Sequence, residues 1–342
     1  MSFLKWSLRL CVGAVLVYLL LFKHELAFRN VFQHLAELPL PYVLAALALY
    51  NTCQLMSAYR WAKLSTLGGR PVQFRDVWPI FYSGMFFNIC LPTSIGGDVL
   101  RVVGLSRKTG SKSAALASVF MDRNVGLGAL LLVGLISSLV VVTSVEATFR
   151  GVTHVFPLWP LFLILIAGYI ALNTAFFSDR FCHFVTHVIQ RMRLKFISER
   201  IEKLHNSLQA YRQPLGRYGE AFAISLLYQC IETALVVVLA IGMKIHASVF
   251  VFSAMVPFQA VAGLLPITFS GVGVREGIFV AVLKGQLGDN VKTAAFALAL
   301  GYFGVIVMSS LFGGVVYLLS GVTRPTTVET EALANTAVSS GE

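Results

Sequence analysis

Two short stretches of the chain share one arrangement of residues that suits anion binding. The spacing Leu-Pro-x4-Gly-x3-Arg occurs from Leu91 to Arg101 and again from Leu265 to Arg275. Proline removes a backbone N–H donor and disfavours helix at the residue before it, while glycine permits positive φ, so each stretch predicts a break in a helix. A helix that restarts after the break presents unpaired N–H groups and a positive dipole end, with the arginine about one turn further along. These features together are typical of a phosphate site.

Other polar residues lie inside long apolar segments. Asp122 and Arg123 fall about two turns into the segment 114 to 142, where Ser118, Asp122 and Gly126 share one helix face. A charged group at membrane depth costs about 2.5 to 3.5 kcal/mol on insertion scales, so its presence indicates a structural or functional role. We expect Asp122 to neutralise a neighbouring arginine.

A second polar stripe lies in the fifth apolar segment. Ser225, Gln229 and Glu232 follow a helical spacing near its middle. Glu232 is a candidate partner for Arg123 or Arg275, or a protonatable group that couples transport to an ion. Structural pairing is the more frequent role of such a residue.

Simpler structural roles compete with ligand binding at several of these positions. Asp98 and Glu276, near helix starts, suit N-terminal caps, and glycine in membrane helices often serves close packing. The arginines are the strongest candidates. The candidate substrate-binding residues, taken from both motifs and both polar stripes, are Asn88, Pro92, Gly96, Gly97, Asp98, Arg101, Asp122, Arg123, Glu232, Pro266, Gly271, Gly273, Arg275 and Glu276.

Composition determines the elements that must position these residues. Of 342 residues, 57% are hydrophobic and 13% are charged, and the mean hydropathy is +0.77. Ordinary soluble domains are about a quarter charged, so this chain cannot cover a surface that meets water everywhere. Long unbroken apolar runs favour α-helices over a closed barrel in the bilayer. The net charge of +11 suits cytoplasmic loops and anionic lipid headgroups, and we set nucleic acid aside as a partner.

Six apolar segments are long enough, or nearly so, to cross about 30 Å of hydrocarbon. They are 6 to 22, 40 to 59, 114 to 142, 155 to 177, 219 to 242 and 293 to 319. Two further stretches, 77 to 91 and 248 to 265, end at the Leu-Pro breaks. We predict an all-α, polytopic membrane protein with about six full spanning helices and two re-entrant helical hairpins, at about 77–110 and 248–288. The membrane domain covers residues 1–320, with the first segment retained as an anchor, and the polar tail 321–342 is disordered.

The distribution of lysine and arginine indicates the orientation. With both hairpins re-entrant and the N-terminus inside, 19 of these residues fall on the cytoplasmic side and 6 outside. If both hairpins crossed fully, the count becomes about 9 inside against 16 outside, which the positive-inside rule rejects. A full crossing by the second hairpin alone gives 20 against 5, so the count leaves that hairpin undecided. We expect both termini in the cytoplasm.

The two motif regions continue to match downstream. The run KSAALA from Lys112 corresponds to KTAAFA from Lys292, and each run opens a spanning helix. Chance similarity between alanine-rich helix starts is one explanation, but duplication also accounts for the shared order. With both hairpins re-entrant, the helix after the first runs outward and the helix after the second runs inward, which is the inverted-repeat plan of many transporters.

The remaining segments give weaker indications. The basic amphipathic stretch 191 to 212 is predicted to lie on the inner headgroups or to form a solvated loop helix, and residues 24 to 38 to lie on the outer face. The run from Gly104 to Ser113 has the wrong spacing for a phosphate-binding loop, and His183 and His187 lack the glutamate of a zinc protease. We therefore expect no enzyme activity, with no catalytic residue, metal or cofactor.

The quoted residues resemble a known family in order and spacing. The runs NICLP from Asn88, GGDVLR from Gly96, Asp122-Arg123, Leu265-Pro266 and GVGVRE from Gly271 are similar to motifs of the lysylphosphatidylglycerol synthase transmembrane (flippase-like domain) family, over about residues 8 to 320. The resemblance implies a bacterial or archaeal inner-membrane protein that moves lipids between leaflets. We expect a stand-alone member without the aminoacyl-transfer domain of bifunctional members, so synthase activity is not carried over. Stand-alone members are associated with different lipids, including isoprenoid-linked and hopanoid-type molecules, so the substrate stays open.

We therefore expect a flippase that moves a phosphate-bearing lipid, either a phospholipid or an isoprenoid- or glycolipid-linked molecule, between the leaflets of the cell inner membrane. Arg101 and Arg275 would bind the headgroup, and the glycine turns would donate backbone N–H groups. The alternatives are a membrane enzyme that acts on a lipid-linked substrate and a non-transporting scaffold in envelope lipid biosynthesis. The expected partners are membrane lipids with anionic headgroups, with envelope biosynthesis enzymes or a second copy of the chain as further options. Because we find no nucleotide-binding motif, the lipid would move either by passive exchange or by coupling to an ion.

Overall fold

The computed structural model describes residues 28–66, 72–90, 96–148, 158–191, 195–209, 211, 215–264 and 271–320. This part of the chain is all helical, with twelve α-helices, one short 3-10 helix (η3, Asp289–Val291) and no strand. The predicted span 6 to 22, the prolines Pro92 and Pro266, and the tail 321–342 lie outside the described residues.

The helices follow the apolar segments of the sequence. Their bounds are α2 Phe28–Ala36, α3 Leu40–Ser65, α4 Phe74–Cys90, α5 Gly96–Thr109, α6 Lys112–Thr148, α7 Trp159–Phe177, α8 Asp179–Arg191, α9 Lys195–Gln209, α10 Leu215–Gly242, α11 Val249–Leu264, α12 Val274–Leu287 and α13 Lys292–Ser320.

Four helices are long and apolar enough to cross a membrane, namely α6, α7, α10 and α13. Helices α2 and α3 meet at an angle of 82° and make a fifth crossing if they count as one bent span. Five of the six predicted spans therefore correspond to helices, and the described part contains four or five crossings by length and composition.

Helix α3 is longer than the sequence predicts. The predicted span ends at residue 59, whereas the helix continues to Ser65. Arg60, which directly follows the predicted span, therefore belongs to the helix, where it is buried. The apolar count ends too early because α3 carries polar residues on its buried face.

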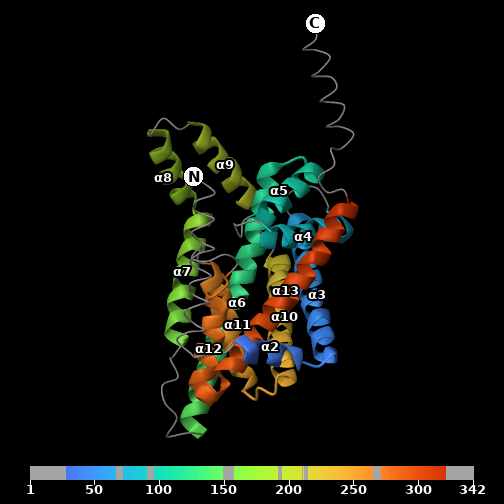
Figure 1. Cartoon of the computed structure of the whole chain (residues 1–342). Coiled ribbons are helices and arrows are strands. Elements are labelled where there is room, and N and C mark those ends of the chain that lie inside the picture. The colour runs from blue at the N-terminus through green and yellow to red at the C-terminus, as the bar shows by residue number, and fades with distance from the viewer. Residues whose placement is uncertain are drawn as a thin grey trace.

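Each of the two predicted hairpin regions contributes a pair of helices to the described part of the chain. Helix α4 packs against α5, and α11 packs against α12. Figure 1 shows α5 at one end of the molecule, where α8 and α9 also lie, and α12 toward the opposite end, near α2. The long helices that follow these pairs, α6 and α13, run in opposite directions between the two ends (Figure 1).

The packing of eight helices repeats when the two halves of the chain are exchanged. The first set is α3 to α6 and the second is α10 to α13. Helix α4 packs against α13 and α6 packs against α11, which are the same contact after the exchange. The contacts of α3 with α6 and with α13 likewise become those of α10 with α13 and with α6, while α3 and α10 pack against each other. This crossed packing is the pattern that duplication of a four-helix unit predicts.

The contact between α4 and α13 is close because two glycines of α13 face α4. A Cβ atom at Gly313 would clash with the Tyr82 carbonyl oxygen, and one at Gly314 would lie 2.8 Å from the Phe86 ring. In a membrane no hydrophobic effect drives helices together, so they associate through close packing, and small residues allow their backbones to approach. Tyr82 of α4 and Val316 of α13 belong to one hydrophobic core at this contact, and a larger core lies mainly among α3 and α10 to α13.

Helices α7 to α9 lie outside the two matched sets. Phe162 of α7 is fully buried beside Gly134 of α6, whereas many other α7 side chains are exposed apolar groups, as suits contact with lipid. Leu204 and Leu208 of α9 pack against α6, and the Tyr211 hydroxyl donates to the Leu64 carbonyl oxygen at 3.1 Å. The described residues 201–209 and 211, which belong to the amphipathic stretch 191 to 212, therefore dock on the bundle.

Candidate functional site

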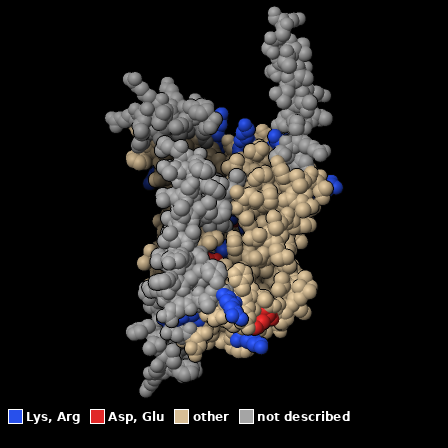
Figure 2. Space-filling model, viewed as in Figure 1, with Lys and Arg blue, Asp and Glu red and all other residues tan. Residues whose placement is uncertain are grey.

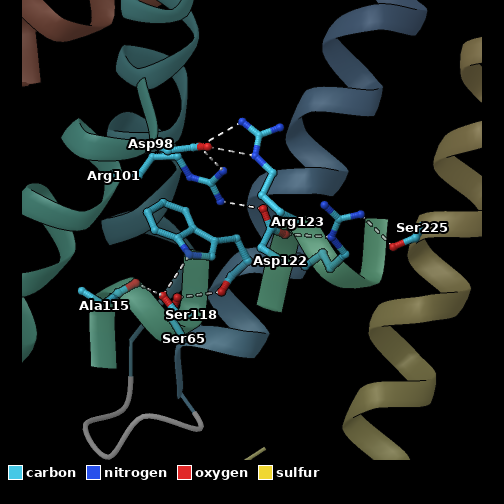
Figure 3. A network of polar contacts seen from close by, with 10 residues as sticks. Ser65, Asp98, Arg101, Ala115, Ser118, Asp122, Arg123 and Ser225 are labelled. Carbon is cyan, nitrogen blue, oxygen red and sulfur yellow. Dashed lines mark hydrogen bonds and ion pairs between the residues drawn. The ribbon is translucent and has the colours of Figure 1, made fainter. Parts of the chain in front are cut away.

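Asp122 accepts hydrogen bonds from two arginines inside the helix bundle. Its Oδ1 lies 2.8 Å from Arg60 Nε, and its Oδ2 lies 2.6 Å from Arg101 Nη2. Arg60 Nη1 also donates to the Ser225 hydroxyl at 2.7 Å, so the contacts join α3, α5, α6 and α10 (Figure 3). None of the three charged side chains is more than 8% exposed. The expectation that Asp122 neutralises an arginine is confirmed, and it neutralises two.

Asp98 connects this buried cluster to an exposed arginine. Its Oδ1 lies 3.3 Å from Arg101 Nη1, and its two oxygens accept hydrogen bonds from Arg123 at 2.9 and 3.1 Å. Figure 3 shows the Asp98 carboxylate between the Arg101 and Arg123 side chains. Exposure falls along this row of charges, from 56% at the Arg123 side chain to 21% at Asp98 and 4% at Arg101.

We call Arg60, Asp98, Arg101, Asp122 and Arg123 the charge row. Its three guanidinium groups and two carboxylates leave one positive charge uncompensated. On the face shown in Figure 2, most visible Lys and Arg side chains lie toward the two ends of the molecule, and the described residues visible between these ends carry few charged side chains. The charge row is therefore an exception within a region that carries little charge, and it suits an anionic ligand.

Aromatic rings hold Arg101 in place. Its guanidinium carbon lies 4.1 Å from the centre of the Trp61 ring and 4.8 Å from that of Phe81. The Trp61 indole N–H in turn donates to the Ser118 hydroxyl at 3.2 Å. Stacking of this kind orients a guanidinium and contributes about 0.5 to 2 kcal/mol. Within the described part of the chain, Arg101 Nε has no hydrogen-bond partner, so the side chain keeps one unused donor.

The start of α5 is positioned by close packing on α4. A Cβ atom at Gly97 would clash with the Gly84 carbonyl oxygen. The Gly97 N–H donates to Asn88 Oδ1 at 2.9 Å, so Asn88 caps the helix and Asp98 stays available to the arginines. Gly97 therefore has the packing role that the sequence allowed as an alternative, and its N–H is not a free donor for a ligand in this structure. Gly96 is the first residue of α5.

The second motif builds a different arrangement at the start of α12. Gly271 and Gly273 have positive φ values of 75° and 88°, which glycine adopts without strain. The Gly273 N–H donates to the Glu276 carboxylate, which is fully buried and caps the helix. Arg275 Nη1 lies 3.9 Å from Glu276 Oε1. Glu276 thus has the capping role allowed from the sequence, and the Gly273 N–H is already bonded.

Glu232 belongs with the second motif. The Tyr302 hydroxyl donates to Glu232 Oε1 at 2.7 Å. The Arg275 guanidinium carbon lies 6.0 Å from the centre of the same tyrosine ring and 4.8 Å from that of Phe303. Arg123, the other predicted partner of Glu232, bonds Asp98 instead.

Five residues of these sites were missed from the sequence: Arg60, Trp61, Phe81, Tyr302 and Phe303. A signal for Arg60 was present, because polar residues recur at every third position along α3, and residues three apart are neighbours on a helix surface. These residues are Asn51, Gln54, Ser57 and Arg60. The aromatic residues gave no comparable signal, since phenylalanine, tryptophan and tyrosine are common throughout apolar helices.

A sequence model of the family described as the Lysylphosphatidylglycerol synthase TM region matches residues 6–313. The chain belongs to this family. The matched region contains the whole charge row, the second motif and all eight helices of the crossed packing except the end of α13. A search of curated proteins found no relative that matches the chain.

Membership in the lysylphosphatidylglycerol synthase TM family confirms the resemblance seen in the motifs. Together with the long apolar helices, it identifies a multi-pass membrane protein, and the family connects the chain to lipid-related envelope biosynthesis.

Proposed function

We propose that this protein moves a phosphate-bearing lipid between the two leaflets of the cell inner membrane. The charge row is the observation that carries the proposal. Asp122 lies ten residues into α6, or about 15 Å along the helix axis from Lys112, which is about half the thickness of the hydrocarbon core. Three arginines at that depth, with one uncompensated positive charge, suit a ligand that is both anionic and lipid-borne.

Asp98 occupies the position between Arg101 and Arg123 that the headgroup phosphate takes in this proposal. A phosphate presents paired oxygens to guanidinium groups in the same way as a carboxylate. The headgroup first meets Arg123, the exposed end of the row, and replaces Asp98 there. It then reaches Arg101, whose unused Nε–H offers a further donor. Bonds to protein replace the lost hydration, which lowers the cost of carrying the headgroup across the membrane.

The two motifs serve opposite leaflets in this proposal. The crossed packing of the two four-helix sets, with α5 and α12 toward opposite ends of the molecule, supports an inverted repeat. The hairpins at about 77–110 and 248–288 then enter the membrane from opposite faces and return, with both termini in the cytoplasm. Arg101 and Arg275 bind the headgroup from the two sides.

Two other functions compete with transport. A membrane enzyme needs a nucleophile or a metal site, and the described residues hold no cluster of three or more His, Cys, Asp or Glu side chains with metal-binding geometry. A non-transporting scaffold in envelope lipid biosynthesis needs only the buried part of the charge row. The exposed pair of Arg123 and Asp98 favours transport, because a purely structural network gains nothing from an arginine that is half exposed.

Leaflet exchange in liposomes tests the proposal. Purified protein is reconstituted with fluorescent phosphatidylglycerol or a fluorescent polyprenyl phosphate, and exchange is followed by quenching of the outer leaflet. We expect the protein to accelerate exchange of at least one of these lipids. Arg123→Gln slows exchange about tenfold or more, because it removes a charge-assisted contact of about 1.5 to 3 kcal/mol. Lys108→Gln, on the exposed face of α5, leaves exchange unchanged.

The outcomes separate the three functions. Arg101→Lys keeps the charge and loses the forked geometry, so it also slows exchange. Chemical conversion of the lipid would identify an enzyme. Folded wild-type protein that exchanges neither lipid would exclude transport of both and favour the scaffold.

A further inference from the structure

Glu232 lies outside the charge row, in surroundings that suit a proton. It is 8% exposed on α10. Among the described residues, its hydrogen-bond donor is the neutral Tyr302 hydroxyl, and no ion pair with a lysine or arginine reaches it. An ionised carboxylate without a close cation is costly to bury, and a proton removes that cost.

Gln229 provides a second, independent indication. It precedes Glu232 by three residues, so the two side chains share one face of α10. Gln229 is 4% exposed, and within the described part of the chain its Oε1 has no hydrogen-bond donor. An ionised carboxylate only accepts hydrogen bonds, whereas a protonated one also donates. Protonated Glu232 therefore supplies the kind of donor that this site lacks.

The described charged and titratable groups near Glu232 come from several helices. Arg275 of α12 faces the ring of Tyr302, whose hydroxyl donates to Glu232. Both Glu232 and Arg275 act electrostatically on Tyr50. The other neighbours are Tyr50 and Cys53 of α3, Tyr228 of α10, Glu276 beside Arg275, and Arg123 of α6, which interacts electrostatically with Tyr228. Helix α11, also packed on α10, carries no titratable residue.

We propose that Glu232 binds one proton together with each anionic headgroup, so that a proton gradient drives the lipid movement proposed above. This inference rests on the proposed function. When Glu232 is ionised, its negative charge offsets the field of Arg275 and opposes a second anion. When Glu232 takes a proton from water on one side, that field becomes available to the headgroup. The proton returns to water on the other side, so one positive and one negative charge cross together and no net charge moves.

A pH gradient across liposomes gives a quantitative test. The probe is trace fluorescent phosphatidylglycerol, whose phosphodiester does not titrate near neutral pH. With one proton per lipid, a gradient of about one pH unit produces about a tenfold leaflet asymmetry at equilibrium, with lipid accumulated on the alkaline side. Glu232→Gln, which mimics the protonated state, exchanges lipid without asymmetry. The matched control Glu220→Gln, on the exposed part of the same helix, behaves as wild type.

The result distinguishes the inference from the proposed function. Exchange by wild type without asymmetry overturns proton coupling and leaves transport intact. Asymmetry that follows a sodium gradient at equal pH also overturns it, because the coupled cation is then sodium. Absence of exchange at every pH argues against transport of this lipid, and a direct measurement of Glu232 then decides the inference.

Difference infrared spectroscopy measures the Glu232 proton without any transport step. We expect a carboxylic acid C=O band in purified wild type that is missing from Glu232→Gln. The band loses intensity as the pH rises from about 5 to about 9, and added phosphatidylglycerol restores part of it. A Glu232 signal that stays constant over this range, in either protonation state, overturns the proposal.

Discussion

At the scale of single residues, Asp122 serves as the shared anion of two guanidinium groups that approach it from α3 and α5. Each oxygen of the carboxylate bonds a different arginine, and all three side chains are buried. A buried ion pair gains little over an apolar pair of the same volume, but removal of one partner leaves an uncompensated charge. The stability of the cluster therefore depends on Asp122 more than on either arginine alone.

The variant Asp122→Asn tests this dependence. It keeps the shape of the side chain and leaves Arg60 and Arg101 facing each other without an anion between them, so we expect a loss of about 3 to 5 kcal/mol in unfolding free energy. Thermal unfolding in detergent, followed by tryptophan fluorescence, measures the loss. Glu220→Gln breaks an exposed pair with Lys63 and serves as the control, with an expected loss below about 1 kcal/mol. Equal stability of the two variants would contradict the assigned network.

The local part of this network could be predicted from the sequence, and the long-range part could not. Asp122 and Arg101 were identified because charge inside an apolar segment is visible in one dimension. The partner Arg60 lies 62 residues away from Asp122, and only tertiary packing brings α3 beside α6. Asp98 and Glu276 occupy similar positions near helix starts, yet one pairs with arginines and the other caps its helix, because Asn88 already caps α5.

At the scale of helices, close contact between backbones depends on a few glycines. Helix α13 offers a matched pair of positions for a test. A Cβ atom at Gly313 would clash with the Tyr82 carbonyl oxygen of α4, whereas one at Gly304 would meet no atom within 4 Å. The two sites lie on the same helix and differ in what they face.

We predict that Gly313→Ala destabilises the protein by about 1 to 3 kcal/mol, since α4 and α13 must separate to admit the methyl group. Gly304→Ala is neutral or slightly stabilising, because alanine has the higher helix propensity. Thermal unfolding of both variants under the same conditions checks the difference. A neutral result at Gly313 would show that α4 and α13 do not pack as closely as described.

Helix positions followed from hydropathy alone to within a few residues, apart from the C-terminal ends of α3 and α6 and the whole of α8, for which the sequence predicted no element. The contacts between helices did not follow, because one apolar face is interchangeable with another until the whole bundle is assembled. Gly97 illustrates the difference: the sequence allowed both anion binding and close packing, and the contact with Gly84 shows the packing role.

At the scale of the whole molecule, the crossed packing explains how two short motifs from different halves of the chain lie in one helix bundle. Each half contributes helices that complete the core of the other, so α6 supports α11 and α13 supports α4. The two halves are not chemically equal, since the first builds the charge row and the second places Arg275 beside Glu276, Tyr302 and Phe303. This asymmetry is consistent with the separate roles proposed for headgroup binding and proton coupling.

The most direct test of the account asks whether α5 and α12 face opposite sides of the membrane. Single cysteines are introduced by Ser106→Cys and Gln286→Cys after the five native cysteines are replaced by serine. A membrane-impermeant thiol reagent is then applied to intact spheroplasts and to inverted vesicles. We predict that Gln286→Cys reacts in spheroplasts and Ser106→Cys reacts in inverted vesicles. Reaction of both positions from the same face would contradict the inverted arrangement and the lipid route built on it.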